Sequence, residues 1–364
     1  MNVTVDRKEF FEKLELVGRV STKHITLPVL QCVLIEAKGD EVFLRATNLE
    51  IAIEASVRAR VGENGVVAVP AAVLIQTVNL NNEKEITLRL EDNSLLVEGI
   101  GFETQIKTIP TEEFPSIPRV SGGGQTLNGP LFSLGIKSTA FAASLSSIKP
   151  ELGSVYVFQK KEHTLTFVAT DSFRLFEKTV PQKGIVLDGS VLIPQKNALE
   201  IARVCDSVVG DPVFRLGEHQ CSLEFPGGVY ITSRLVSGTF PDYEQIIPKE
   251  FPTKSTILKE DLVHAFKKTN IFLNKFFQVG FNVTKNSVTI TAGNGEVGNT
   301  TESMKAHTEG DDISLSFNQR YVAEALPHFS DDSIILQLSG IGRPMVIRGV
   351  NDQSVRYLVM PMNK

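Results

Sequence analysis

Ala46-Thr47-Asn48 returns as Ala169-Thr170-Asp171 and again as Ala292-Gly293-Asn294, each time 123 residues further along the chain. The repeat extends beyond these residues, because three strand-like segments also end 124 residues apart: VVAVP at Pro70, SVLIP at Pro194 and ISLSFN at Asn318. Proline and asparagine are favoured where helices begin, so each segment predicts a strand that leads into a helix. The chain of 364 residues therefore holds one structural unit three times.

Each unit combines helical and strand patterns. Phe10, Ile136 and Leu262 lie 126 residues apart, and each opens an apolar pattern at helical spacing. Residues 86–90 alternate apolar and polar before an Asp-Asn-Ser turn, which predicts a half-buried strand entering a hairpin. Equivalent strands are expected at 214–216 and 221–225 in the second unit and at 334–338 in the third. The predicted fold class is α+β, with antiparallel sheet and two helices in each unit.

A unit of about 120 residues can bury its own core, so we expect three domains in tandem. The predicted domains are residues 1–120, 127–248 and 249–364, with a linker at 121–126. The stretch from Ser121 to Gln125 contains three consecutive glycines, a composition typical of a flexible linker.

Composition describes an ordinary globular chain, with 42% hydrophobic residues, 22% charged residues and a net charge of −5. No apolar run reaches the ~20 residues that span a membrane, and the N-terminus lacks a signal-peptide layout. Cys32, Cys205 and Cys221 are dispersed in apolar stretches. They are interpreted as buried thiols of a cytoplasmic protein.

One motif favours an enzyme. Gly293 to Gly298 fits G-x-G-x-x-G after a strand-like segment, which taken alone suggests a dinucleotide site. The residues that follow lack the apolar face of a helix that would hold a pyrophosphate, so a hairpin turn is the preferred interpretation. A nicotinamide-dependent enzyme stays as an alternative.

Other catalytic signatures are missing from the sequence, including a P-loop, G-x-S-x-G and histidine pairs at metal-ligand spacing. The carboxylate pairs, at residues 112–113, 311–312 and 331–332, are expected in solvated turns. The sequence therefore predicts a binding or scaffolding protein without catalytic residues, metal or cofactor.

Charge is spread unevenly along the chain. Six stretches are expected to be helical: 7–23, 71–80, 137–149, 195–206, 259–275 and 319–328. They contain 14 Lys and Arg against 8 Asp and Glu, a net charge of +6, which leaves −11 for the remaining residues. Basic helices on an acidic body suit a polyanion, and ordinary solvated helix faces are the alternative. If the partner is a nucleic acid, contact is expected with phosphates and largely independent of sequence.

The chain also resembles a known family, the beta subunit of bacterial DNA polymerase III, or beta sliding clamp. The resemblance covers the whole length and is carried by five segments: Thr26-Leu-Pro-Val-Leu30, Thr108-Ile-Pro-Thr-Glu-Glu-Phe-Pro115, Val168-Ala-Thr-Asp-Ser-Phe-Arg-Leu175, Thr232-Ser-Arg-Leu-Val-Ser-Gly-Thr-Phe-Pro-Asp-Tyr243 and Tyr357-Leu-Val-Met-Pro-Met362.

The resemblance implies three DNA-clamp domains per chain and two chains forming a homodimeric ring of six domains. Sheets would form the outer wall, and helices would line a hole that encircles double-stranded DNA. Such a processivity factor tethers the replicative polymerase, is opened by an ATP-driven clamp loader, and performs no chemistry itself. Implied partners are the DNA polymerase III alpha subunit, the clamp loader and other proteins with a clamp-binding motif.

The resemblance also implies particular site residues. Partner peptides would enter a cleft between the second and third domains, formed by Leu152, Thr170, Arg174, Leu175, Pro241, Ile246, Asn318, Tyr321, Pro344, Leu358, Met360, Pro361 and Met362. Residues Phe173, Gln245 and Asn363 depart from the family pattern at this cleft and are expected to shift peptide preference.

At the ring interface, the strand Phe102 to Ile109 would meet the region Glu296 to Lys305, and the residues implicated are Ile106, Ile271, Phe272, Glu296 and Glu302. Intrachain core is the alternative for the three apolar residues, and the third-domain edge is poorer in glutamate than the family pattern. DNA would be faced by Lys23, His24, Lys149, Lys196, Arg203, Lys267 and Lys268. A specialised clamp paralogue with altered cleft affinity is the second alternative function.

Overall fold

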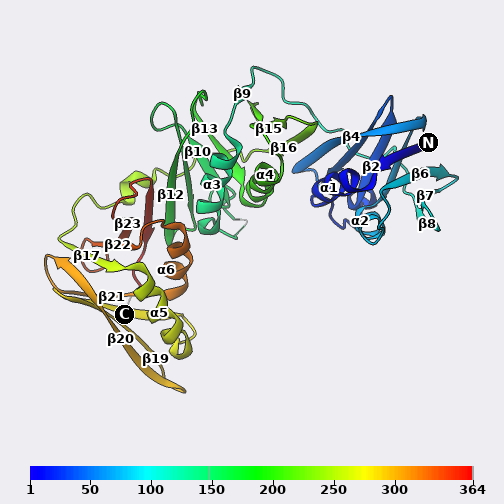
Figure 1. Cartoon of the computed structure of the whole chain (residues 1–364). Coiled ribbons are helices and arrows are strands. Elements are labelled where there is room, and N and C mark those ends of the chain that lie inside the picture. The colour runs from blue at the N-terminus through cyan, green and yellow to red at the C-terminus, as the bar shows by residue number, and fades with distance from the viewer. Residues whose placement is uncertain (147, 363–364) are drawn as a thin grey trace. The chain divides into compact units, whose positions relative to one another are not determined.

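A computed structural model describes residues 1–146 and 148–362 of the chain (Figure 1). Its contacts divide the chain into two compact units, which are described separately. The first comprises Met1–Ser133, Lys183–Ile185 and Glu200–Leu235. The second comprises Leu134–Gln182, Val186–Leu199 and the described residues from Val236 onward.

The first unit is built on one large antiparallel sheet. Its strands follow the order β8-β7-β6-β1-β4-β16-β15-β14-β9, and β2 and β3 connect β5 to β4. Their bounds are β1 Asn2–Asp6, β2 Cys32–Lys38, β3 Glu41–Thr47, β4 Ile51–Glu63, β5 Gly65–Pro70, β6 Glu85–Glu91, β7 Ser94–Gly99, β8 Phe102–Lys107, β9 Gln125–Thr126, β14 Val213–Leu216, β15 Gln220–Phe225 and β16 Val229–Arg234. The last two residues of the expected linker thus belong to the sheet as β9.

The second unit also contains one antiparallel sheet, in the order β13-β10-β11-β12-β24-β23-β22-β17-β20-β19-β18-β21. The bounds are β10 Ser154–Phe158, β11 Thr164–Thr170, β12 Arg174–Pro181, β13 Ser190–Pro194, β17 Thr253–Leu258, β18 Gln278–Val283, β19 Ser287–Asn294, β20 Gly298–Glu309, β21 Ile313–Asn318, β22 Ser333–Leu338, β23 Met345–Gly349 and β24 Val355–Val359.

Each sheet joins strands from two repeats. In the first unit β4 of the first repeat pairs with β16 of the second, with Ile51 opposite Ser233. In the second unit β12 of the second repeat pairs with β24 of the third, with Leu175 opposite Leu358. Pairing across the repeat boundary satisfies backbone groups that would otherwise form exposed sheet edges. Three repeats are therefore organised around two continuous sheets.

Two α-helices accompany each repeat: α1 Arg7–Gly18, α2 Ala71–Asn79, α3 Gly129–Thr139, α4 Gln195–Ser207, α5 Lys259–Thr269 and α6 Gln319–Ala325. The predicted starts after Pro70, Pro194 and Asn318 are confirmed by α2, α4 and α6. At α6 the Asn318 side chain accepts a hydrogen bond from the Arg320 backbone N–H at 3.0 Å, as an N-cap should.

The predicted helix at residues 137–149 is wrong. The helix there, α3, begins at Gly129 and ends at Thr139. Asn128 initiates it by accepting a hydrogen bond from Leu131 N at 3.0 Å. Ile136 was expected to open the helix but lies in its last turn. The apolar spacing that begins at Ile136 continues into the 3₁₀ turn Ala140–Ala142, and for this reason the sequence pattern placed the helix start there. The predicted stretches 7–23 and 259–275 also run past the observed ends of α1 and α5.

The hairpin predictions are confirmed. Asp92 has a φ of 46° between β6 and β7, which is the left-handed conformation that Asp tolerates in tight turns. Gly293 to Gly298 is also a hairpin turn, since β19 pairs with β20 and Asn294 lies opposite Gly298. The turn leads into β20, so this segment does not form the strand–turn–helix of a dinucleotide-binding motif.

All three cysteines are buried, as predicted. Burial raises the pKa of the Cys32 thiol to about 11 and that of Cys221 to about 12. Both thiols therefore stay protonated near neutral pH and act as small apolar core groups. None of the helices in the described part of the chain has the length and apolar character that crossing a bilayer requires.

Candidate functional site

The turn between β11 and β12 positions the first predicted cleft residues. Thr170 Oγ1 donates to the Arg174 carbonyl at 2.6 Å and accepts from Ser172 N at 3.2 Å. Asp171 Oδ1 accepts from the backbone N–H groups of Phe173 and Arg174 at 2.9 and 3.0 Å. Side chains of Thr and Asp that bond the backbone two or three residues ahead define a tight turn. This turn presents Phe173, which is 59% exposed.

Arg174 is held by groups from three segments. Its Nε donates to Asp171 Oδ2 at 3.0 Å, one terminal nitrogen donates to the Phe141 carbonyl at 2.9 Å, and the other pairs with Glu324. The guanidinium carbon lies 4.6 Å from the Tyr321 ring centre, within cation–π range. Burial alone would lower the pKa of Arg174, but the hydrogen bond with Glu324 and the nearby carboxylates raise it. The side chain is a fixed cation that joins β12 to α6.

An apolar cluster lies beneath these polar contacts. Leu152, Leu175 and Leu358 are buried in one cluster, and half-buried Met360 packs against it. Leu175 and Leu358 are partners across the β12–β24 junction. Because Met360 covers the cluster only in part, a partner's apolar side chain would meet a flexible, polarisable surface here.

The C-terminal segment runs along this surface. Met360 N donates to the Phe173 carbonyl at 2.8 Å, and Met362 N donates to the Ser316 carbonyl at 2.8 Å. Pro361 and Met362 line a pocket of about 450 Å³ together with exposed Ile341. Backbone hydrogen bonds therefore fix the segment while its side chains stay accessible.

The loop that carries Pro241 and Ile246 is anchored by a buried ionic network. Tyr243 Oη donates to Glu177 Oε2 at 2.5 Å, and Arg356 Nη2 donates to the same oxygen at 2.6 Å. Burial and the Glu177 charge raise the pKa of Tyr243, so its hydroxyl remains a donor. The network ties this loop to β12 and β24.

The structure therefore brings the thirteen predicted cleft residues onto connected elements of the second unit. Pro241 and Ile246 are exposed, and the half-buried members are Asn318, Tyr321, Met360, Pro361 and Met362. The buried members are Leu152, Thr170, Arg174, Leu175, Pro344 and Leu358. Gln245 donates to Asp242 Oδ2 at 2.9 Å, and Asn363 lies outside the described residues.

Sequence reasoning missed several residues that support these side chains. Phe141, Asp171 and Glu324 hold Arg174, and Tyr243 and Arg356 anchor the loop. Tyr243 ends the segment Thr232–Tyr243 that carries the family resemblance, which was the available signal. Glu324 and Arg356 carry no sequence signal, because their partners are 150 and 179 residues away.

The predicted DNA-facing residues have different settings. Lys23 and His24 lie in the loop after α1, beyond the observed end of the helix predicted at 7–23, and His24 Nδ1 accepts from Leu27 N at 3.1 Å. Lys149 was placed on a helix, which is wrong, because α3 ends ten residues before it. The remaining four lie on helices: Lys196 and Arg203 on α4, and Lys267 and Lys268 on α5.

Two of these cations are engaged in ion pairs. Arg203 pairs with Glu200 on the same helix, and Lys268 Nζ lies 2.7 Å from Glu302 Oε2 on β20. Both are surface pairs of the kind that contributes little to stability. Their charges are therefore partly neutralised where DNA contact is predicted.

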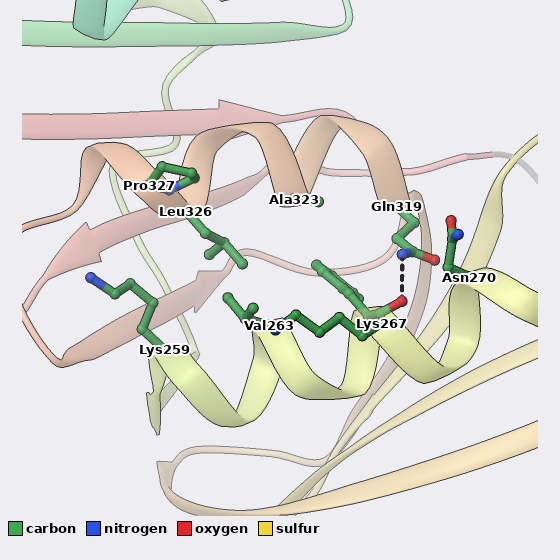
Figure 2. A pocket seen from close by; sticks show the side chains of 9 residues that line it. Lys259, Val263, Lys267, Asn270, Gln319, Ala323, Leu326 and Pro327 are labelled. Carbon is green, nitrogen blue, oxygen red and sulfur yellow. Dashed lines mark hydrogen bonds between the residues drawn. The ribbon is translucent and has the colours of Figure 1, made fainter.

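The two helices of the third repeat pack side by side (Figure 2). Gln319 Nε2 donates to the Phe266 carbonyl at 2.9 Å and links them. An apolar pocket of about 480 Å³ lies between α5 and α6, with Lys259 and Lys267 among its lining residues (Figure 2). Lys259 Nζ is already bonded to the Phe329 carbonyl at 2.7 Å.

The helices are less basic than the sequence pattern suggested. Within the observed bounds they contain ten Lys and Arg against eight Asp and Glu, a net charge of +2 instead of +6. The difference comes from residues beyond the helix ends: Arg19, Lys23, Lys149 and Lys275. Loops at the helix termini thus carry much of the positive charge.

Of the predicted ring-interface residues, Ile106 and Glu302 lie on sheet-edge strands, and Ile271 and Phe272 lie in the 3₁₀ turn after α5. β8 is the last strand of the first sheet. In the second unit, residues 298–305 of β20 pair with β19 on one side. β17 pairs only with residues 306–309 of β20, so the other side of residues 298–305 is open.

The predicted interface residues differ in exposure. Ile106 is 4% exposed and packs within its own chain, so the intrachain alternative holds for it. Ile271 is 66% exposed and Phe272 is half-buried. Glu296 lies in the β19–β20 turn, and Glu302 lies on β20.

Three repeats of antiparallel sheet with two helices each, and sheets that continue across repeat boundaries, are the architecture of DNA clamps. Family models of DNA polymerase III beta subunit match nearly the whole chain: the N-terminal domain at residues 1–118, the central domain at 126–242 and the C-terminal domain at 244–363. The chain belongs to the DNA polymerase III beta subunit family, the beta sliding clamps.

Individual relatives are similar over their full length. The beta sliding clamp of Pseudomonas putida is 28% identical over 371 residues, covering 100% of both chains. The beta sliding clamp homolog GriR of Streptomyces muensis is 26% identical over 372 residues, covering 100% of this chain and 99% of GriR. The crystal structure of the Pseudomonas aeruginosa DNA polymerase III subunit beta superimposes with a TM-score of 0.94 at 26% identity, and each chain is covered to 100%.

Proposed function

We propose that two copies of this chain close into a ring of six clamp domains that encircles duplex DNA and serves as a processivity factor. The proposed domains are residues 1–120, 127–248 and 249–364. The observation that carries the proposal is the membership of three successive clamp domains in one family. A closed ring stays on DNA by topology, and weak, screened phosphate contacts let it slide. The ring performs no chemistry itself.

Two open sheet edges support the ring. β8 presents one edge, and residues 298–305 of β20 present the other. Pairing between these edges of two chains would satisfy their backbone groups and remove exposed edges. Exposed Ile271 and half-buried Phe272 would add apolar contact beside this pairing.

Ring closure is tested by the dimer itself. Sedimentation velocity of Ile271→Asp should show a marked shift toward monomer, because a buried carboxylate without a partner is strongly unfavourable. Ile341→Asp is the matched control, since Ile341 is 86% exposed on the loop between β22 and β23, outside both open edges. An unchanged dimer in the Ile271 variant would contradict the proposed interface.

The partner surface proposed for this ring is the cleft formed by the residues around Arg174, Leu175 and Met360. Met360 and its apolar cluster would take a peptide's apolar anchors, and Arg174 with Asn318 would border the peptide. The proposed partners are the DNA polymerase III alpha subunit, the clamp loader and other proteins that carry a clamp-binding motif.

The topological mechanism is tested on nicked circular plasmid with a bacterial clamp loader and ATP. The complex is isolated by gel filtration, and protein retention is measured before and after one restriction cut. Retention on the circle with loss after cutting supports the ring. Equal retention on both forms contradicts it, and the Ile271→Asp variant provides a ring-defective control.

A further inference from the structure

The first unit contains a pocket that repeats the scaffold of the proposed cleft. We call it the I–II pocket; its volume is about 350 Å³, and it is lined by residues 47, 49–52, 115–118, 220, 232 and 234. We propose that the I–II pocket is a second peptide-binding site, which takes a partner segment with an aliphatic anchor beside a carboxylate. The kind of ligand, though not the pocket, rests on the proposed function of the cleft.

The turn that borders the I–II pocket matches the cleft turn bond for bond. Thr47 Oγ1 donates to the Ile51 carbonyl at 3.0 Å and accepts from Leu49 N at 3.0 Å. Asn48 Oδ1 accepts from Glu50 N and Ile51 N at 3.0 and 2.9 Å. Leu49 has a φ of 76°, and its counterpart in the cleft turn has a φ of 78°. The two turns therefore present their third and fourth residues in the same way.

The strand that crosses this turn is matched as well. Arg234 N donates to the Glu50 carbonyl at 2.8 Å, just as Met360 N donates to the Phe173 carbonyl at 2.8 Å. Arg234 thus takes the position that Met360 takes in the cleft. The main chain builds the same recess twice, and side chains alone distinguish the two.

These side chains give the I–II pocket a different chemistry. Ile51 replaces the buried arginine of the cleft, and Ala52 replaces its leucine, so the floor is apolar and less filled. The wall is also shorter, because the phrase from Phe114 to Pro118 spans five residues where its repeat from Phe240 to Pro248 spans nine. A recess of this kind suits an aliphatic side chain.

Charge at the rim specifies the second part of the ligand. The Arg234 side chain is 66% exposed and makes no side-chain hydrogen bond within the described residues. It forms a long ion pair with Glu50, with 3.9 Å between Nη1 and Oε1, which is too far for a hydrogen bond. A ligand carboxylate can accept from the guanidinium in bidentate geometry, and Glu50 would oppose it by like charge.

The test uses methyl NMR on the full chain with labelled isoleucine δ1 methyls. Ile51 and Ile117 report on the I–II pocket, and Ile246 reports separately on the cleft. The probes are acetyl-Leu-Leu-Asp-amide and its neutral match acetyl-Leu-Leu-Asn-amide. We expect saturable shifts at Ile51 and Ile117, with the Asp probe about fivefold tighter than the Asn probe.

Variants of the rim should act in opposite directions. Arg234→Gln should abolish the preference for the Asp probe, and Glu50→Gln should strengthen binding of that probe. Leu49→Asn should weaken both probes, because it removes an apolar lining residue; asparagine tolerates the positive φ of this position. Shifts confined to Ile246, or equal affinities that Arg234→Gln leaves unchanged, would overturn the I–II pocket and leave the cleft proposal standing. Failure of the plasmid assay with normal probe binding would overturn the ring proposal and leave the I–II pocket standing.

Discussion

The Tyr243 hydroxyl helps to hold the loop that carries Pro241 and Ile246, beside the ion pairs of Glu244 with Arg356 and Lys160. Tyr243 Oη donates to Glu177 Oε2 at 2.5 Å, and both side chains are buried. Tyr243→Phe removes this donor and keeps the aromatic ring of the side chain in place. A hydrogen bond to a charged group contributes about 1.5–3 kcal/mol. Because Arg356 still donates to the same oxygen at 2.6 Å, we expect the free energy of unfolding to fall by about 1.5 kcal/mol, the lower end of this range.

The loss should be visible in thermal unfolding at fixed protein concentration. With a shift of about 2–4 °C per kcal/mol for units of this size, the Tm should fall by roughly 3–6 °C. Tyr156→Phe is the matched control. Tyr156 is half-buried and stacks on Phe240 with ring centres 4.6 Å apart, and its hydroxyl makes no hydrogen bond within the described residues. Its Tm should change by less than about 1 °C.

The comparison of the two variants decides the argument. If Tyr243→Phe lowers the Tm no more than Tyr156→Phe does, Arg356 alone satisfies Glu177 and the reasoning about the loop is refuted. A true anchor should also affect binding, so Tyr243→Phe should weaken a cleft peptide by a few-fold in fluorescence anisotropy, whereas Tyr156→Phe should not.

Three further predictions concern the second unit. Deleting residues 360–364 removes the cleft's C-terminal segment, so affinity for a labelled polymerase alpha-subunit peptide should fall at least about tenfold in anisotropy while the protein stays dimeric in sedimentation; retained affinity in a folded dimer would remove the cleft assignment. Burial, followed by the charge of Lys178, lowers the pKa of His328, so the unfolded chain binds a proton that the folded chain excludes, and the unfolding free energy should fall as pH drops below about 6.5. Urea titrations at pH 7 and 5 should show a shallower fall for His328→Gln, and an equal fall in both proteins would contradict this. Gly310 has a φ of +99°, and an added Cβ would lie 1.8 Å from a backbone oxygen, so Gly310→Ala should lower the unfolding free energy by about 2–3 kcal/mol, whereas Gly123→Ala, which meets no atom within 4 Å, should change it by less than about 0.5 kcal/mol.

Several local features of the repeats were predicted correctly from sequence patterns. The helices after Pro70, Pro194 and Asn318 and the hairpin at Asp92 all lie where the sequence placed them. These features depend on caps, turns and periodicity within a few residues, which act before any tertiary contact forms. The prediction failed at α3 because an apolar spacing continues through Ile136 into a 3₁₀ turn, and periodicity alone does not show where a helix begins.

The candidate site was predicted residue by residue through family resemblance, and the structure shows what supports it. Arg174, Leu175 and Leu358 could be placed from their motifs, but the pairing of Arg174 with Glu324 and of Leu175 with Leu358 could not be predicted. Those contacts join segments more than 140 residues apart, and their pairing depends on strand register, which no short pattern encodes.

The sequence by itself determined three α+β repeats, some of their strands and most of their helices, because propensity, capping and alternation are local properties of the chain. Tertiary structure alone decided that the repeats share two continuous sheets, through β4 with β16 and β12 with β24. It also decided that one turn scaffold carries two different recesses. The physical reason is that backbone hydrogen bonds between distant strands set which side chains face each other, and burial then gives those side chains their chemistry.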